Sequence, residues 1–331
     1  MPTTFPEWKE LQPPKQGLCA LRLVEINGEP ALFGAMIARA SQSVIETTGQ
    51  QHVMELAPIA LPKGALPPAF AVPALFDMAP EFDLASDPSG NILVAAERFQ
   101  GGSNALVVGE AAQGNFTVTA LYQDFTDYQR PRFIRGSAKP GSRTTAVANR
   151  NNVALLAHQP LDPKQFGQAP APFHHLIAGD AGLVIAQGAA QDPLDSALLL
   201  AKAPPTGSGA LATGERPSTL ALHEITQGKI SHKAATLFGT DATYGFDADI
   251  AGNRLLVLGS TLQGAQLISH DLNSGKTAAI DWPTPVPGDW AASPSVLVLS
   301  GGKTLALAFF EGTGRAATGI RYAQLDLTSL G

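Results

Sequence analysis

The sequence predicts an all-β fold in which a four-stranded antiparallel unit repeats along the chain. The first observation is a repeat: residues 82–122 and 246–282 each begin Phe-Asp and continue through a Gly-Asn turn, two apolar runs and a further Gly turn to a last strand. The second is that no segment shows a sustained apolar period of 3.6, so little helix is expected. The third is composition, because 44% of the residues are hydrophobic and only 15% are charged, which suits many short buried strands.

Self-similarity at this period is typical of the blades of a β-propeller. We therefore predict a single β-propeller over residues 17–331, preceded by an extended tail over residues 1–16. A chain of 331 residues is within the range of one all-β domain. Dividing the chain after the tail into six units gives about 52 residues for each, so six blades are favoured, with seven as the alternative.

The N-terminal third begins with four prolines in the tail, together with Phe5 and Trp8. These aromatic residues belong either to a disordered terminus or to a segment that docks onto a partner or onto the body of the fold. Apolar and alternating runs separated by turns such as Asn27-Gly28 then predict four strands, at residues 18–26, 31–37, 43–47 and 52–59. Five prolines within residues 62–80 predict a long irregular connection on the surface.

The remaining units are less regular, except for the second clear repeat. Residues 132–178 and 182–238 each predict one unit with an insertion, and residues 289–327 contain only three convincing strands. An N-terminal strand, most simply Cys19–Ile26, would complete this last unit and close the ring. Closure of this kind removes an open sheet edge.

Two turns carry a resemblance to known propellers. The segment Asp271-Leu272-Asn273-Ser274-Gly275-Lys276 resembles the turn between outer strands of WD40-like and YVTN-type propellers. Residues 300–306, with the sequence Ser-Gly-Gly-Lys-Thr-Leu-Ala, resemble a hairpin of the same group. Glycine is suited to such turns because it adopts positive φ without steric cost. The resemblance implies the fold, but turn chemistry of this kind carries no function with it.

Charge and cysteine content narrow the function classes. The formal net charge of −6 argues against a general nucleic-acid binder. Cys19 is the single cysteine, so the chain has no intramolecular disulfide and no cysteine-based zinc site. The N-terminus lacks the pattern of a secretory signal, and no apolar run is long enough to span a membrane. The expected location is cytoplasmic if Met1 is native and periplasmic if an N-terminal signal was removed.

Three aspartates are the first candidates for chemistry. Asp83, Asp247 and Asp289 stand at the expected starts of innermost strands, which line the central channel of a propeller. Carboxylates that converge there could act as acid and base or bind Ca²⁺, for which Asp83 and Asp247 are the candidates. The alternative is that each aspartate caps a turn or accepts backbone N–H groups within its own blade. No other cofactor is expected.

The second candidate is a basic segment. Between Asp127 and Asp162 there is no acidic residue, whereas six residues are basic: Arg130, Arg132, Arg135, Lys139, Arg143 and Arg150. Tyr128 lies beside them. Guanidinium groups on a loop suit carboxylate or phosphate oxygens, which they bind bidentately. The alternative is that these arginines form ion pairs with acidic residues on neighbouring blades.

These observations favour a non-catalytic propeller that binds a partner protein or an anionic ligand through one face of the ring. The residues expected to bind are Tyr128, Arg130, Arg132, Arg135 and Arg143. The alternative is a lactonase-like or glycoside-acting hydrolase that uses Asp83, Asp247 and Asp289. The resemblance of the two turns to YVTN-type propellers supports it, because propellers of that general group include lactonases. A third interpretation is a structural subunit that docks through its Pro-rich segments. No nucleophile-elbow or phosphate-loop motif occurs in the sequence.

Overall fold

In the computed structural model, the residues described below lie mostly in β-strands. The described residues are 8–13, 17–48, 52–72, 82–86, 89–100, 103–122, 129–133, 135–136, 144–149, 152–157, 174–177, 180–186, 196–203, 219–227, 229–230, 235–238, 245–261, 264–280, 290–313 and 316–330. Within them the helices are α1 (Gln42–Thr48) and the 3₁₀ turn η2 (Leu327–Leu330). No helix in these residues has the length and apolar character needed to cross a membrane.

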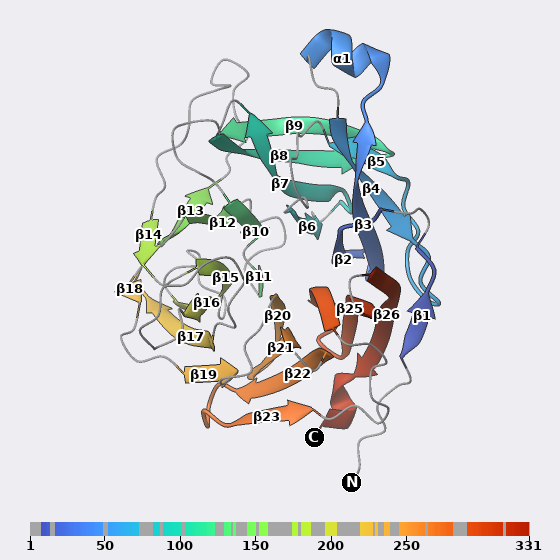
Figure 1. Ribbon diagram of the computed structural model, residues 1–331. Coiled ribbons are helices and arrows are strands. Elements are labelled where there is room, and N and C mark those ends of the chain that lie inside the picture. The colour runs from blue at the N-terminus through green and yellow to red at the C-terminus, as the bar shows by residue number, and fades with distance from the viewer. Residues whose placement is uncertain are drawn as a thin grey trace.

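The strands of the described residues form six sheets placed around a common centre (Figure 1). The first sheet contains β2 (Ala20–Ile26), β3 (Glu29–Arg39), β4 (His52–Ile59) and β5 (Phe70–Val72). The second contains β6 (Phe82–Ser86), β7 (Ile92–Gln100), β8 (Ser103–Ala112) and β9 (Asn115–Tyr122). The third contains β10 (Gln129–Phe133), β12 (Thr144–Asn149), β13 (Asn152–Ala157) and β14 (His174–Ile177).

The other three sheets complete the ring. The fourth contains β15 (Asp180–Ala186), β16 (Ser196–Ala203), β17 (Thr219–Thr226), β18 (Lys229–Ile230) and β19 (Ala235–Phe238), with β11 (Arg135–Gly136) parallel to β15. The fifth contains β20 (Phe246–Ala251), β21 (Arg254–Thr261), β22 (Gly264–Asp271) and β23 (Thr277–Ile280). The sixth contains β24 (Trp290–Val298), β25 (Thr304–Thr313), β26 (Ala316–Asp326) and β1 (Lys9–Leu11).

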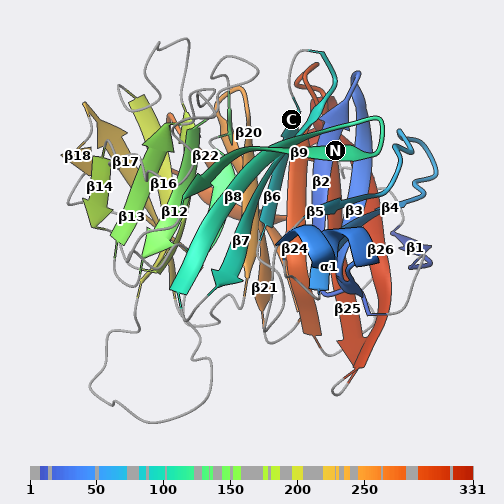
Figure 2. The same ribbon diagram turned by 90° about the horizontal axis from the view of Figure 1, so that it is seen from above.

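This arrangement is a β-propeller, as the repeat predicted. Residues 82–122 and the strands within 246–282 each form one four-stranded sheet with the strands in chain order. The sheets stand side by side around the axis when the molecule is turned (Figure 2). The two turns noted in the sequence also form: Gly275 and Gly302 adopt positive φ, at 68° and 65°, at the β22–β23 and β24–β25 connections.

The N-terminal strand closes the ring in a velcro-like manner, but a different strand does so from the one predicted. β1 pairs antiparallel with β26, with Lys9 opposite Tyr322 and Leu11 opposite Ile320. The prediction that Cys19–Ile26 completes the last sheet was wrong, because Ala20–Ile26 forms the first strand of the first sheet. Within the predicted tail, Trp8 packs edge-on against Phe309 with ring centroids 5.0 Å apart, so this part docks onto the body of the fold.

Two local predictions also need correction. Residues 43–47 were expected to form a strand but lie in α1, where the Ile45 N–H donates to the Ser41 carbonyl and the Gln42 side chain bonds Glu46. A serine just before a helix supports its start, and a Gln–Glu pair four residues apart stabilises its first turn. The Pro-rich connection also contains a strand, since Phe70–Val72 forms β5 at the edge of the first sheet.

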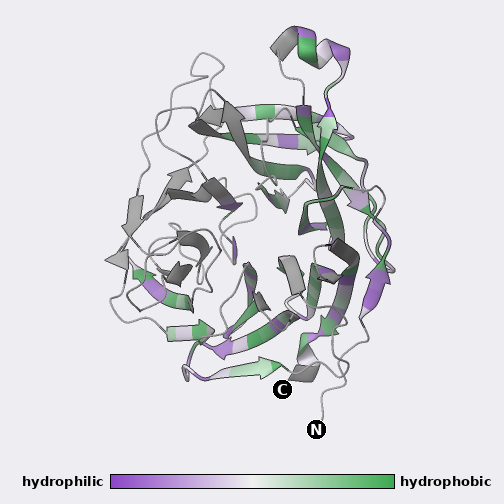
Figure 3. Ribbon diagram, viewed as in Figure 1, coloured by the Kyte–Doolittle hydropathy of each residue, from purple (hydrophilic) through white to green (hydrophobic). Residues whose placement is uncertain are grey.

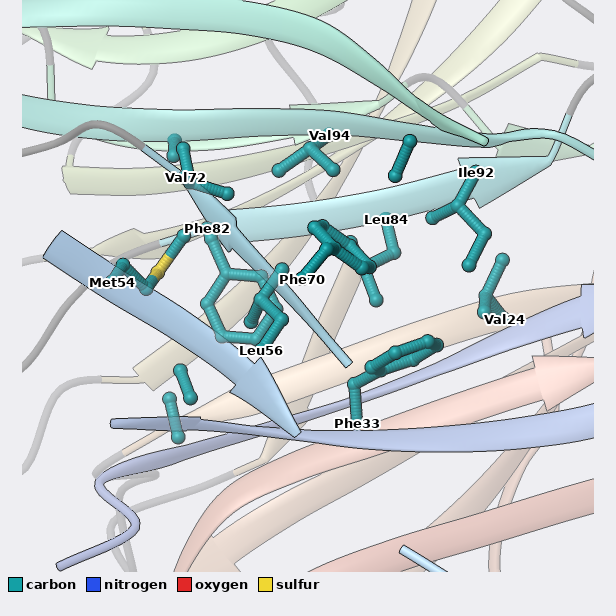
Figure 4. Close-up of a cluster of buried hydrophobic side chains, with 14 of the residues drawn as sticks. Val24, Phe33, Met54, Leu56, Phe70, Val72, Phe82, Leu84, Ile92 and Val94 are labelled. Carbon is teal, nitrogen blue, oxygen red and sulfur yellow. The ribbon is translucent and has the colours of Figure 1, made fainter. Parts of the chain in front are cut away.

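Apolar side chains fill the space between neighbouring sheets. Figure 4 shows the cluster between the first and second sheets, where Phe33, Met54 and Phe70 meet Phe82 and Val94. Burial of each such side chain stabilises the fold by about 1.5–3 kcal/mol. The hydropathy colours follow this pattern, with hydrophobic residues along the strands of these two sheets and the hydrophilic β11 near the middle of the ring (Figure 3). The centre is therefore where the polar groups require explanation.

Candidate functional site

The aspartate of the repeated Phe-Asp motif connects one sheet to the next. Asp83 on β6 and Asp247 on β20 are both 0% exposed. The Phe133 N–H donates to Asp83 Oδ2 at 2.9 Å, and the Val296 N–H donates to Asp247 Oδ2 at 2.8 Å. Phe133 lies on β10 and Val296 on β24, and each of these strands is the first strand of the next sheet along the chain. The expectation that such aspartates accept N–H groups within their own blade was therefore wrong for these two.

The same contact recurs with other side chains. Asp249 Oδ2 accepts the Val298 N–H at 2.8 Å, again between β20 and β24. Ser295 Oγ accepts the Leu23 N–H at 2.8 Å, between β24 and β2 across the ring closure. Buried backbone donors need a partner, and these side chains supply it between neighbouring sheets. The aspartate of the Phe-Asp motif thus links neighbouring sheets, and equivalent links occur at other places around the ring.

Arg135 lies between the two aspartates. Its Nη2 is 3.1 Å from Asp83 Oδ1, and its Nη1 is 3.2 Å from Asp247 Oδ2. Nη1 also donates to the Val296 carbonyl at 2.5 Å. The side chain is 9% exposed. A planar guanidinium with several donors suits this position, and it joins β11 to the second, fifth and sixth sheets.

Arg22 on β2 is a second buried cation at the centre. Its Nε donates to the Phe82 carbonyl at 3.0 Å and its Nη1 to the Leu21 carbonyl at 2.7 Å. Nε is also 3.5 Å from Asp83 Oδ1. The guanidinium lies 5.6 Å from the centroid of the Phe82 ring, a distance typical of a cation–π contact. Two of the five N–H donors of Arg22 thus bond carbonyl oxygens of the protein.

Arg132 on β10 differs from both. Its Nη1 is 3.8 Å from Asp83 Oδ1, which is within ion-pair range but too long for a hydrogen bond. Nη1 is buried and has no hydrogen-bond partner, although the side chain as a whole is 17% exposed. In the described part of the chain, Asp83 is its one ion-pair partner. We call Arg22, Arg132, Arg135, Asp83 and Asp247 the central arginine cluster.

The pKa values show how charge is distributed in this cluster. Burial and, next in size, the positive charge of Arg132 lower the pKa of Arg22 to about 9, against the attraction of Asp83 and Asp247. Burial also acts to lower the pKa of Arg135, but Asp247 and Asp83 outweigh it, so that this pKa is raised overall. Arg22 thus experiences more repulsion from Arg132 than attraction from Asp83.

Asp249 stands beside the cluster without an ion pair among the described residues. Its Oδ1 accepts the Ile250 N–H at 2.9 Å, and its Oδ2 accepts the Val298 N–H. Burial raises the pKa of Asp249 to about 6, against the opposing attraction of Arg135 and these two hydrogen bonds. Its charge therefore changes in a range where ordinary aspartates stay ionised.

Four of the predicted site residues come together in the structure. These are Asp83, Asp247, Arg132 and Arg135, although the two groups were proposed for different functions. Tyr128, Arg143 and Asp289 lie outside the described residues, and Arg130 lies on β10 with its side chain outside them.

Sequence reasoning missed Arg22 and Asp249. Arg22 could have been found as a lone charge in the apolar run 18–26. Asp249 could have been found because it follows Asp247 by two residues, on the same face of its strand.

The geometry limits what the aspartates can do chemically. Within the described residues, no group of three or more His, Cys, Asp or Glu side chains is placed to hold a metal ion. Arg135 lies between Asp83 and Asp247, so Ca²⁺ bound by both carboxylates would have to displace a guanidinium. Arg132, in contrast, has donors that a carboxylate or phosphate oxygen can accept from.

Comparison with known proteins finds solved structures of low similarity. The sequence matches no protein-family model and none of the curated proteins. Among solved structures, similar chains include hydrazine synthase from Kuenenia stuttgartiensis (12% identity, 92% of this chain and 79% of that chain, TM-score 0.47). Others are an α-L-arabinofuranosidase from Podospora anserina in complex with cellotriose (10%, 98% and 98%, 0.46) and the β-propeller domain of the trilobed protease from Pyrococcus furiosus (11%, 89% and 80%, 0.43). At this distance the matches carry no information on function.

Proposed function

We propose that this chain is a non-catalytic, six-bladed β-propeller that binds the anionic group of a small-molecule ligand at its central arginine cluster. The observation that carries the proposal is the guanidinium of Arg132, whose buried Nη1 has no hydrogen-bond partner. Six sheets in the described part of the chain support the blade number. Arg22 and Arg135 each donate two hydrogen bonds to protein oxygens, which favours Arg132 as the group that meets a ligand.

The energetics of an unpaired buried donor support this assignment. A buried donor without a partner costs about 1–3 kcal/mol, and more when the group is charged. An anion at Arg132 would supply the missing acceptor and would also offset the repulsion between Arg132 and Arg22. Charge-assisted hydrogen bonds to a guanidinium are among the stronger polar contacts in proteins.

The hydrolase alternative has less support from the geometry. A general acid, base or nucleophile must come within hydrogen-bonding reach of the substrate. Asp83 and Asp247 are fully buried, and each already accepts a backbone N–H and contacts Arg135. Assays on lactones and aryl glycosides separate the two functions. Turnover that disappears in Asp247→Asn would favour a hydrolase, whereas we expect no turnover above background from the parent protein.

Ligand binding is tested by thermal unfolding against anionic sugars, sugar phosphates, nucleotides and divalent metals, with EDTA controls. A ligand at about 100 times its Kd stabilises the folded state by about 2.7 kcal/mol, which is readily measured. We expect a saturable shift with an anionic compound that is lost in Arg132→Ala. The matched control is Arg39→Ala, which removes an exposed arginine at the end of β3 and should keep the shift. A shift that persists in Arg132→Ala contradicts the proposal, and the absence of any shift would favour a protein partner.

A further inference from the structure

The N-terminal strand β1 is attached to the outer edge of the sixth sheet by a small set of contacts. It pairs with β26 over three residues, with Glu10 opposite Arg321. On one face of β1, Leu11 packs into the apolar cluster between the sixth and first sheets. On the other face, Trp8 meets Phe309 edge-on. The attachment of β1 therefore depends on a short ladder and on the side chains of Trp8 and Leu11.

The ion pair between Glu10 and Arg321 adds little to this attachment. Glu10 Oε2 and Arg321 Nη1 are 3.7 Å apart, which is too long for a hydrogen bond, and the Glu10 side chain is 51% exposed. Arg321 Nη2 donates instead to Glu311 Oε1 on the neighbouring strand β25, at 2.5 Å. Arg321 therefore keeps a carboxylate partner when β1 leaves, and no buried charge is left alone.

Two polar atoms of β26 lack a hydrogen-bond partner while β1 is in place. In the described part of the structure, Arg321 Nε and Tyr322 Oη are buried and make no hydrogen bond. Arg321 and Tyr322 lie opposite Glu10 and Lys9, on the stretch of β26 that β1 covers. Buried polar atoms without a partner raise the free energy of the closed state, and release of β1 brings water to these residues. Their position under β1 favours its release.

Other contacts hold the sixth sheet to the first. Ser293 Oγ on β24 accepts the Leu21 N–H at 2.8 Å, beside the Ser295 contact described above. The Ser300 N–H, in the turn after β24, donates to Glu25 Oε2 on β2 at 2.6 Å. In the described part of the chain, β1 contributes one residue to the apolar cluster between these two sheets. The ring therefore has closing contacts that do not require β1.

We propose that β1 is a latch that opens locally: residues 8–11 leave β26 and return while the six sheets stay folded and the ring stays closed. Opening breaks the three-residue ladder and exposes Trp8, Leu11 and the outer edge of β26. An element with few buried contacts opens at a lower free energy than the core. The latch thus controls the exposure of a strand edge, a surface that pairs readily with extended chains.

Native-state hydrogen exchange of the full chain tests the latch. We expect the β1 amides that bond β26 to exchange at least about 100-fold faster than the protected amides of β25. Their exchange should not depend on low concentrations of denaturant, because local opening exposes little surface.

Two core variants separate local opening from global unfolding. Leu11→Ala should speed the exchange of β1 by at least about tenfold, because it removes a side chain that is buried only while the latch is closed. Val94→Ala, in the core of the second sheet, should speed the exchange of β25 and leave that of β1 unchanged. Lys9→Ala, at an exposed position of β1, is the matched control and should change β1 exchange by less than about twofold.

Three outcomes would overturn the proposal. The first is β1 exchange with the same rate and denaturant dependence as that of β25. The second is an equal acceleration of β1 and β25 exchange in Val94→Ala. The third is loss of protection in β2 and β24 at the same denaturant-independent rate as in β1, because the ring would then open together with the latch.

Discussion

Asp83 and Asp247 hold the same place in two copies of one motif, yet their surroundings differ. Each accepts a backbone N–H from the first strand of another sheet, and each contacts Arg135. Asp83 is also within 3.8 Å of Arg22 and Arg132, whereas Arg135 is the one ion-pair partner of Asp247 among the described residues. The repeat therefore specifies the contact between sheets, and the extra arginines near one copy create the candidate site.

The largest effects should come from removing the two aspartates. Breaking a buried ion pair by removing one partner costs about 3–5 kcal/mol, because the other charge stays buried. We expect Asp83→Ala to lower the free energy of unfolding more than Asp247→Ala, since it leaves three guanidinium groups without their shared carboxylate. Denaturant unfolding measures both, with Glu29→Ala at an exposed position of β3 as the control. Equal losses of unfolding free energy in the two variants would mean that Arg22 and Arg132 add nothing to the cost of removing Asp83.

Arg135→Ala should come next, at about 3 kcal/mol. The substitution leaves Asp83 and Asp247 buried without the cation between them and removes the hydrogen bond to the Val296 carbonyl. The measurement is again the free energy of unfolding by denaturant. A cost below about 1 kcal/mol, the range of exposed ion pairs, would contradict the role of Arg135 in joining the sheets.

Ser295→Ala tests whether the uncharged version of the same contact is equivalent. The variant leaves the buried Leu23 N–H without its acceptor, which costs about 1–2 kcal/mol. Thermal and denaturant unfolding should both register this loss. Ser295→Thr retains the hydroxyl and should recover part of the stability; if both variants behave like the parent, the inter-sheet hydrogen bond is not a source of stability.

Asp249 predicts a pH dependence of the free energy of unfolding. Because burial raises the pKa of Asp249 to about 6, the folded state binds a proton more readily than the unfolded state. The contribution of this group to the free energy of unfolding therefore falls as pH rises from about 4, its ordinary value, to about 6. Asp249→Asn should remove this slope. Unfolding of parent and variant is measured across that range, and a constant difference between them would contradict the shift.

The smallest effect on stability is expected for Arg132→Ala, below about 1 kcal/mol in the absence of ligand. Arg132 Nη1 makes no hydrogen bond, and its loss also removes repulsion on Arg22. Comparison with Arg135→Ala in the same unfolding assay tests whether Arg135 stabilises the fold while Arg132 does not. A cost as large as that of Arg135→Ala would show that Arg132 is structural as well, and would weaken its assignment to a ligand.

Much of the fold was predictable because it depends on local patterns. The Phe-Asp repeat, the alternation of apolar residues and the turn glycines Gly275 and Gly302 act within one sheet, and each corresponds to structure where it was expected. Sequence reasoning also selected Asp83, Asp247, Arg132 and Arg135, since charges in an otherwise apolar chain stand out. It failed at residues 43–47, where an alternating run suggested a strand but the hydrogen bonds of Ser41 and Gln42 favour a helix.

Only the tertiary structure decided which of these residues meet. Asp83, Arg135 and Asp247 are far apart in the sequence and come together because three sheets converge on one centre. The strand that closes the ring was likewise decided by the tertiary structure. The open edge of the sixth sheet is at β26, and Lys9–Leu11 pairs there, whereas Ala20–Ile26 is the first strand of the first sheet. Propensity and alternation thus determined the strands, whereas the pairing of buried charges depended on distances across the ring, which no local pattern encodes.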